Sequence, residues 1–212
     1  MDWRARSNLY MMIIMQRPPA KRTARSRKEL THERILEVAA RAIRRSGYSG
    51  IGVADIMKEA GLTHGGFYAH FASREAMLAE AAERAGADSA AAAARIVTAA
   101  PPEQALESVL RAYLSKAHVE NMEMGCPVTA LGSETPRQVP EVRRVVTRQI
   151  KEMIDGIARL LPNWGQPGAH EQALVTVATM VGTLLLARAV DDTKLSDALL
   201  KAALKRLAAN NA

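Results

Sequence analysis

A three-residue turn between two short helical segments constrains the fold of this chain more than any other feature of its sequence. Residues 53–60 predict about two helical turns, and residues 64–70 predict a second short helix. Between them lie Gly61, Leu62 and Thr63, where Gly61 tolerates a positive φ and Thr63 is able to cap the following helix. The pattern therefore predicts a helix-turn-helix.

The side chains of this unit divide into an apolar set and a polar set. We expect the apolar set to lock the two helices together before any partner binds; it comprises Ile56, Ala60, Leu62, Phe67 and Phe71. His64 and Tyr68 are four residues apart and would share one face of an α-helix. Gly65 and Gly66 are unusual inside a helix, where each costs about 1 kcal/mol relative to alanine. Their lack of side chains indicates close approach of the backbone to a partner.

The rest of the sequence also has helical periodicity. Aromatic residues make up only 4% of the chain, so burial depends on Ala, Leu, Val, Ile and Met, which mostly favour helices. Further helices are expected over residues 31–46, 73–97, 102–119, 127–132, 141–161, 169–190 and 193–208. No stretch shows convincing strand alternation, and no internal repeat is visible. The predicted fold class is all-α, with about nine helices.

The charge of the chain favours a polyanionic partner. Its 212 residues carry a formal net charge of +7, and nucleic acid is the commonest polyanion that basic proteins bind. A basic balance also occurs in proteins of membrane surfaces and in proteins with neither partner. The helix-turn-helix favours DNA, because the second helix of such a motif enters a major groove.

The N-terminal residues predict neither a membrane anchor nor a signal peptide. The apolar run at residues 9–15 is far shorter than the roughly 20 residues of a membrane helix, and no small-residue cleavage site follows it. We expect residues 1–27 to form a flexible basic extension, with Met11, Met12 or Met15 as alternative translation starts. We also expect a basic arm that either enters a minor groove or attracts DNA non-specifically. It comprises Arg22, Arg25, Arg27 and Lys28.

Six motifs occur in order between residues 31 and 78. They are Thr31-His32-Glu33-Arg34-Ile35-Leu36, Gly47-Tyr48, Val53-Ala54-Asp55-Ile56, Ala60-Gly61-Leu62-Thr63, Gly65-Gly66-Phe67-Tyr68-Ala69-His70-Phe71 and Ser73-Arg74-Glu75-Ala76-Met77-Leu78. Together they resemble the DNA-binding domain of TetR-type (tetracycline repressor-like, TetR/AcrR) regulators. Tyr113-Leu114-Ser115-Lys116-Ala117-His118 and Gly125-Cys126-Pro127-Val128 are similar to one subgroup of that family, whose ligands are mostly undefined.

The resemblance implies a DNA-binding surface with assigned residues. Those residues are Thr31, Thr63, His64, Gly65, Tyr68, His70 and Arg74. The three at the start of the recognition helix would meet bases, and the other four would contact phosphates. The resemblance also implies three parts, a flexible extension over residues 1–27, a DNA-binding domain over 28–75, and a ligand-binding and dimerisation domain over 76–212.

Two positions depart from the family pattern. Ile51-Gly52 stand where the family often has a phosphate-binding Thr or Ser, and His64 replaces a commoner Lys. Simpler alternatives remain open, in which Tyr68 is a half-buried ring, His70 a solvated histidine and Arg74 a surface charge. A cation in the first turn of a helix opposes the helix dipole, so we expect an external anion at Arg74.

A symmetric dimer is expected, because one short helix reads few base pairs and paired half-sites need a two-fold partner. The resemblance places the contact on residues 169–190 and 193–208. The predicted dimerisation residues are Val177, Met180, Val181, Leu184 and Leu185, with Ala187 beside them. The alternative is that residues 169–190 form only a central core helix.

The helices between these regions predict a pocket for a small hydrophobic or aromatic inducer that lowers operator affinity. Its predicted lining is Leu114, Met122, Met124, Cys126, Val128, Leu131, Met153 and Trp164. Methionine suits such a pocket because its flexible side chain repacks around varied shapes. Ordinary core packing is the alternative for each of these residues.

Cys126 is the one cysteine, so no intrachain disulfide forms and a cytoplasmic location is expected. Its position before Pro127, at a predicted helix N-terminus, raises a second hypothesis, a regulator that senses oxidants or electrophiles through the thiol. A third is a helical adaptor that no longer binds DNA. No metal-ligand cluster, phosphate loop or nucleophile motif is present, so we predict no enzyme activity and no cofactor. Asp191-Asp192 is interpreted as a helix break and cap.

Overall fold

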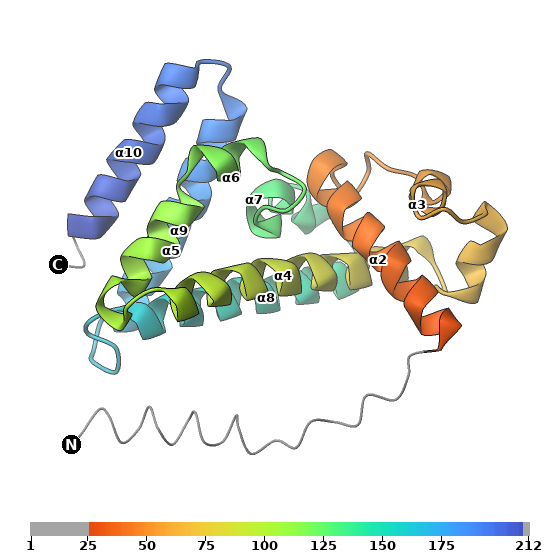
Figure 1. The fold of residues 1–212 in the computed structure, drawn as a ribbon, viewed down its shortest axis with the longest axis horizontal. Coiled ribbons are helices and arrows are strands. Elements are labelled where there is room, and N and C mark those ends of the chain that lie inside the picture. Colours follow the sequence, from red (N-terminus) through yellow and green to blue (C-terminus); the bar gives the residue numbers. More distant parts are fainter. Residues whose placement is uncertain (1–25, 210–212) are drawn as a thin grey trace. The chain divides into compact units, whose positions relative to one another are not determined.

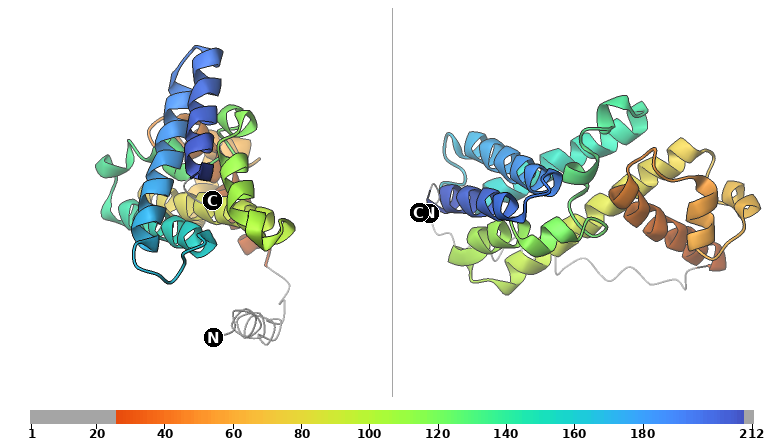
Figure 2. Two further views of the ribbon diagram at one scale, coloured as in Figure 1. Left: turned by 90° about the vertical axis from the view of Figure 1, so that its left-hand side faces the viewer. Right: turned by 90° about the horizontal axis from the view of Figure 1, so that it is seen from above.

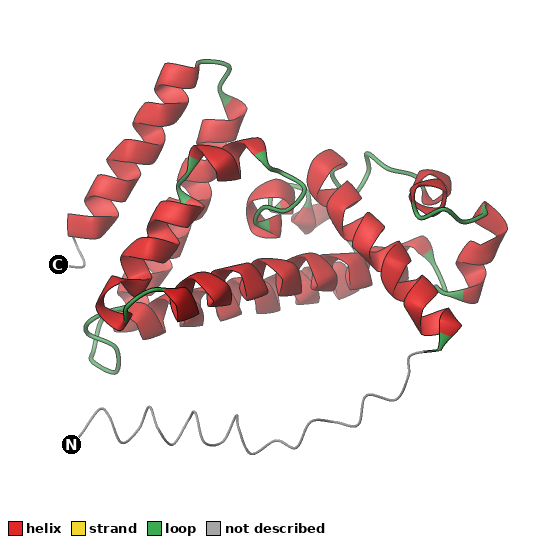
Figure 3. Ribbon diagram, in the orientation of Figure 1, coloured by secondary structure: helices red, strands yellow, loops and turns green. Residues whose placement is uncertain are grey.

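A computed structural model of the chain describes residues 26–209. It comprises two units, one ending at Glu33 and one beginning at Arg34, which are described separately. The predicted extension up to residue 25, with Arg22, Arg25 and the alternative start methionines, lies outside the described residues. Within residues 26–209 the chain has nine α-helices, three short 3₁₀ helices and no strand (Figure 3). The predicted all-α fold class is confirmed.

The helices follow one another along the chain with short connections (Figure 1). Their bounds are α2 Arg27–Ser46, α3 Val53–Glu59, η1 His64–Ala69, α4 Arg74–Ala99, η2 Pro102–Gln104, α5 Ala105–Tyr113, α6 Lys116–Glu120, α7 Pro127–Leu131, η3 Thr135–Arg137, α8 Pro140–Leu160, α9 Ala169–Ala189 and α10 Thr193–Ala209.

A capping box starts α2 earlier than the sequence analysis predicted. The Ser26 amide donates to Glu29 Oε2 at 2.8 Å, and the Glu29 amide donates to Ser26 Oγ at 3.2 Å. These reciprocal bonds satisfy two amides that a helix N-terminus leaves free. The helix therefore begins at Arg27, and Thr31 lies inside its first turns, with its hydroxyl donating to the Arg27 carbonyl at 2.9 Å.

The predicted glycine turn ends α3 in a Schellman motif. Gly61 has a φ of +69°. Its amide donates to the Lys58 carbonyl at 2.9 Å, and the Leu62 amide donates to the Met57 carbonyl at 2.8 Å. These are the two bonds that define the motif, which favours glycine because its residue after the helix is left-handed. The predicted role of Gly61 is confirmed.

The second helix of the motif is a 3₁₀ helix rather than the expected α-helix. Its six residues include Gly65 and Gly66, and glycine disfavours the α-helix. A 3₁₀ helix is common in such short segments. Thr63 occupies the N-cap position, but its side chain makes no capping bond, so the predicted cap is wrong. Ser73, in contrast, caps α4 as predicted, accepting from the Ala76 amide at 3.0 Å.

One apolar cluster holds α3, η1 and the start of α4 against the Ile35–Ser46 part of α2 and against later helices. The apolar residues predicted to lock the motif are buried or packed against this cluster. Leu131 of α7 and Val142 of α8 belong to the same cluster. The core is therefore continuous across residue 75, where a domain boundary was predicted.

The second half of the chain is a bundle. α4 and α8 lie side by side (Figure 1), as do α9 and α10 (Figure 2). The expected single helix over residues 102–119 is instead η2, α5 and α6, because Ser115 accepts from the His118 amide at 3.2 Å and starts a new helix. Asp192 caps α10 through the Lys194 amide at 2.8 Å, which confirms its predicted role.

By length and composition, α9 is the one helix within residues 26–209 able to cross a membrane. Seven of its residues are buried, and it contacts both α8 and α10. A core helix with a second apolar face meets the same criterion, so this feature is weak evidence for a membrane span.

Gly61→Ala and Gly65→Ala form a matched pair for the turn. Gly61→Ala should lower the free energy of unfolding by about 1–2 kcal/mol, because alanine is strained at a positive φ. Gly65→Ala should not destabilise the fold, because a Cβ there meets nothing within 4 Å and its φ is not positive. Urea unfolding of both variants measures the difference, and an equal loss of unfolding free energy in the two would contradict the assigned turn.

Candidate functional site

The exposed surface of η1 is the candidate functional site, and a buried phenylalanine orients it. Phe67 is 1% exposed, whereas the adjacent Tyr68 is 73% exposed. Their rings meet edge to face, with centroids 5.2 Å apart. Phe71 stacks on Phe67, with ring centroids 5.4 Å apart. Tyr68 is therefore a large aromatic side chain presented to solvent by an anchored neighbour.

Thr63, His64 and Gly65 are exposed beside Tyr68. We call these four residues the recognition face. In a 3₁₀ helix, residues three apart eclipse one another and residues four apart are offset by about 120°. The α-helical spacing from which His64 and Tyr68 were predicted to share a face is therefore wrong, although both side chains are exposed. The open space around a Cβ at Gly65 shows that the chain's own packing does not require glycine there.

His70 and Arg74 differ from this exposed set. His70 is half-buried and its ring lies 6.4 Å from that of Phe71. Arg74 Nη2 donates to the carbonyl of Tyr48, and to that of Ile51 at 3.4 Å. These carbonyls already favour the cation in the first turn of α4, so the inference of an external anion from the helix dipole no longer holds. Arg74 anchors the loop between α2 and α3 and retains further N–H donors.

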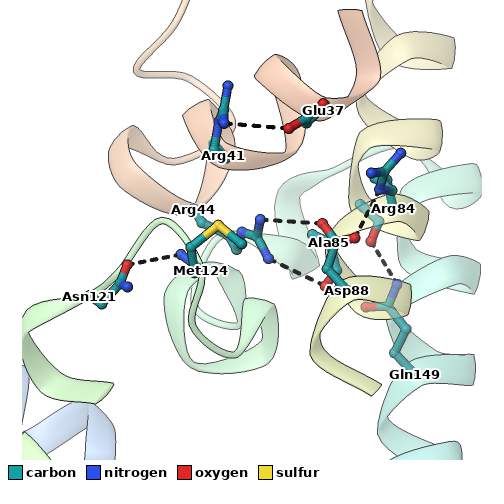
Figure 4. A network of polar contacts seen from close by, with 10 residues as sticks. Glu37, Arg41, Arg44, Arg84, Ala85, Asp88, Asn121, Met124 and Gln149 are labelled. Carbon is teal, nitrogen blue, oxygen red and sulfur yellow. Dashed lines mark hydrogen bonds and ion pairs between the residues drawn. The ribbon is translucent and has the colours of Figure 1, made fainter. Parts of the chain in front are cut away.

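Buried polar contacts connect α2 to α4 (Figure 4). Arg44 is 2% exposed, and its Nη1 donates to the Ala85 carbonyl at 3.4 Å. Its Nη2 lies 3.7 Å from Asp88 Oδ2. Burial lowers the pKa of Arg44, and the nearby Asp88 carboxylate opposes that shift. The end of α2 is therefore fixed on α4 by a charge as well as by apolar packing.

Two further contacts tie α2 and its following loop to later segments. Arg45 donates to Glu123 Oε1 at 2.8 Å, in the loop between α6 and α7, and lies 3.2 Å from Glu59 of α3. The Tyr48 amide donates to Glu134 Oε2 at 3.0 Å. Burial raises the pKa of Tyr48 to about 12. Movement of the α6–α7 loop would therefore act directly on α2.

The structure does not assemble the predicted ligand pocket. Leu114 lies in the cluster of the second half and Leu131 in the cluster of the first. Met122, Met124 and Trp164 are exposed at the surface. All three lie in loops between helices, where no helical periodicity shows which side faces inward. Met153 is partly buried on the second cluster, and Val128 is half-buried on α7.

Two surface hollows have other linings. One of about 490 Å³ lies on α8 among Pro140, Arg143, Arg144, Thr147, Arg148 and Lys151. A second of about 310 Å³ lies between α9 and α10 among Gly168, Glu171, Gln172, Val175, Thr176 and Leu207. Neither includes a residue of the predicted pocket.

A polar cluster at the meeting of α5, α6, α7 and α9 was not predicted. The Tyr113 hydroxyl lies 2.9 Å from Thr129 Oγ1. The ring of His118 meets that of Tyr113 edge to face, with centroids 4.7 Å apart. Arg188 Nη2 donates to the His118 carbonyl at 2.6 Å. Only the TetR-subgroup motifs around Tyr113 and His118 pointed to this region, and nothing in the sequence pointed to Arg188.

His118 joins two segments through both ring nitrogens. Nε2 accepts from the Cys126 amide at 3.0 Å, so Nδ1 carries the proton and donates to the Tyr113 carbonyl at 2.8 Å. This pattern requires a neutral ring. Burial lowers the pKa of His118, with the charge of Arg188 acting in the same direction. Burial also raises the pKa of Tyr113.

Three of the predicted dimerisation residues are buried within their own chain. Val177, Met180 and Leu184 are at most 5% exposed, and Val177 and Met180 belong to the apolar cluster of the second half. They cannot reach a partner, and this part of the prediction is wrong. α9 is apolar nearly all round, so its sequence does not distinguish its two faces. The opposite face exposes Leu174, Val175, Leu185 and Leu186, and α10 exposes Leu195.

Cys126 is 3% exposed, so the structure offers no observation that favours thiol sensing. Within residues 26–209, no three His, Cys, Asp or Glu side chains are arranged to hold a metal ion.

The helix-turn-helix and its exposed recognition face define a DNA-binding protein, and comparison with known families agrees. Residues 35–81 match the model of bacterial regulatory proteins of the TetR family. Residues 102–202 match the C-terminal domain of LmrA/YxaF-like transcriptional regulators. The chain belongs to the TetR family of transcriptional regulators, as its motifs indicated.

Two solved structures share this fold, and one further relative is similar in sequence. A TetR regulator from Chloroflexus aurantiacus is 26% identical with a TM-score of 0.73, and the match covers 86% of this chain and 94% of that one. The reduced form of Escherichia coli NemR is 21% identical with a TM-score of 0.69, covering 84% and 94%. An HTH-type transcriptional regulator of Mycobacterium tuberculosis is 27% identical over 74% of this chain and 83% of its own length.

His118→Gln should reduce the loss of stability in acid. Because folding lowers the pKa of His118, the unfolded chain binds more protons as pH falls through about 6.5, and stability falls with it. The contribution of this one group to the slope of the free energy of unfolding against pH cannot exceed about 1.4 kcal/mol per pH unit. Urea unfolding at several pH values between 5 and 7.5 measures this slope. His170→Gln, exposed at the start of α9, is the control and should keep the wild-type slope.

Proposed function

We propose that this regulator is a repressor that binds a palindromic operator as a homodimer and releases it when a small molecule binds. The observation that carries the proposal is the recognition face, which is exposed because the buried Phe67 fixes the orientation of η1. A rigid, solvent-facing helix at the end of a short turn is the element that a helix-turn-helix protein inserts into a major groove.

The recognition face supplies the chemistry for two kinds of contact. Thr63, His64 and the Gly65 backbone would meet base edges, because they lie at the start of η1. The Tyr68 hydroxyl would donate to a phosphate. Thr31, His70 and Arg74 remain candidates for phosphate contacts, with Arg74 using donors that do not face the α2–α3 loop.

Dimerisation would use the exposed apolar face of α9 together with α10. Leu174, Val175, Leu185 and Leu186 lie along that face, and four large apolar side chains at its surface favour association with a second copy. A two-fold contact places two recognition faces on one duplex, which a palindromic site requires.

Release would follow from a ligand that binds the DNA-free conformation more tightly than the DNA-bound one. The contacts of Arg45 with Glu123 and of Tyr48 with Glu134 join α2 to segments of the second half. They support a route by which a ligand bound there changes the position of η1.

Selection from a random pool of DNA duplexes tests the proposed function. The wild-type protein should enrich a palindromic sequence. Tyr68→Phe should then lower affinity for every sequence by about tenfold, the usual loss for a hydrogen bond to a charged group. His64→Ala should change the preferred bases, and Gly65→Ala should weaken specific binding without destabilising the fold.

Arg159→Gln, exposed near the end of α8, is the control for these variants and should bind as the wild type does. Fluorescence anisotropy at fixed salt gives each affinity. Unchanged affinity and preference in all three variants would mean that η1 does not read DNA. Failure of the wild-type protein to enrich any sequence would favour the adaptor hypothesis.

Leu186→Asp should convert the dimer to a monomer at micromolar concentration, because it puts a charge into the apolar face. Leu30→Asp, at a similarly exposed leucine on α2, should leave the dimer intact. Sedimentation velocity measures both. A wild-type chain that is monomeric at tens of micromolar, or a Leu186→Asp dimer, would contradict the proposed interface.

A further inference from the structure

Arg188 is half-buried, and its guanidinium has no counter-ion among residues 26–209. Its Nη2 donates to the His118 carbonyl at 2.6 Å, but Nε and Nη1 are buried and have no hydrogen-bond partner. Among residues 26–209, no Asp or Glu forms an ion pair with it. Buried arginines are normally paired and fully hydrogen-bonded, so two free donors here require an explanation.

The neighbours of Arg188 do not neutralise it. The groups that act on its charge are the Tyr113 phenol and the Cys126 thiol, and burial has the larger effect, lowering the pKa of Arg188. The only other polar side chains described in this cluster are Thr129 and His118, whose ring nitrogens are both occupied. The cluster thus offers N–H and O–H groups to a guest and lacks a negative charge of its own.

Apolar residues adjoin the polar cluster along the chain. Leu114, next to Tyr113, is buried in the apolar cluster of the second half, and Val119, next to His118, is packed against that cluster. A guest at Arg188 would therefore meet a cationic end and an apolar flank, which is the complement of an organic acid with a hydrocarbon body.

We propose that Arg188 is the anchor of the ligand site and takes the carboxylate of a small organic acid whose apolar body lies toward Leu114. The proposal deepens the proposed function by naming the chemical class of the ligand, and it rests on that function for the consequence of binding. Binding itself needs no DNA, so its failure is distinguishable from failure of the DNA-binding proposal.

The loop between α6 and α7 covers the guanidinium. A Cβ at Gly125 would lie 2.7 Å from Arg188 Nη2, so the loop backbone packs directly on this group. Met122 and Met124 of the same loop are exposed, which leaves little apolar burial to hold it in place. An acid reaches Arg188 when this loop moves, and the loop is the segment that Glu123 ties to Arg45 of α2. Entry of the ligand therefore loosens a contact of the DNA-binding unit.

Isothermal titration of the full chain with matched carboxylates and amides tests the proposal. The probes are acetate, benzoate, 3-phenylpropionate and decanoate, each compared with its primary amide. The wild type should bind the larger acids at least tenfold more tightly than their amides, because a charged acceptor strengthens the bond to a guanidinium. Arg188→Gln should abolish this preference, and Arg188→Lys should retain part of it.

Arg159→Gln is the control and should keep the full preference for acids. Circular dichroism checks that each variant folds. If Arg188→Gln does not fold, the partial preference of Arg188→Lys for acids tests the proposal. Glu123→Gln should raise affinity for the acids a few-fold, because it frees the covering loop from Arg45. Equal binding of acids and amides, no binding of any acid, or an unchanged preference in both Arg188 variants would overturn the proposal.

Discussion

The burial of Phe67 is the constraint on which the functional surface depends. A six-residue 3₁₀ helix with two glycines has little stability of its own, since each glycine costs about 1 kcal/mol relative to alanine. Burying a phenylalanine contributes about 2–3 kcal/mol, and Phe67 is closed in with Phe71 beside it. Packing therefore outweighs the weak local propensity. With Phe67 inward, Gly65 and Tyr68 face solvent, and the orientation of the recognition face depends on that burial.

The helix-turn-helix shares its apolar core with helices of the second half of the chain. Leu131 and Val142 complete its apolar cluster, and α4 runs without interruption from that cluster into the bundle. Polar contacts add to this packing, because Arg45 and the Tyr48 amide donate hydrogen bonds to carboxylates on the segments that follow α6 and α7. A displacement of these segments must either carry α2 with it or break those bonds. This is the physical basis that we propose for coupling between a ligand in the second half and affinity for DNA.

Local signals in the sequence predicted local structure well and long-range contacts poorly. Gly61 and Ser73 were assigned correctly because a positive φ and a side-chain cap depend on neighbouring residues. The capping box of Ser26 and Glu29 was visible in the sequence and was missed. The bonds of Arg74 to the α2–α3 loop and of Arg188 to His118 join distant residues, so no periodicity reveals them. On α9, an apolar pattern on every side concealed which face enters the core.

The central claim is that two copies of η1 lie in successive major grooves on one face of a duplex. Hydroxyl-radical footprinting of the wild-type protein on its selected site tests it most directly. The account predicts two protected patches, symmetric about the centre of the site and separated by one helical turn of about 10 base pairs or a whole multiple of it. A single unsymmetric patch, or protection spread evenly without a centre, would contradict it.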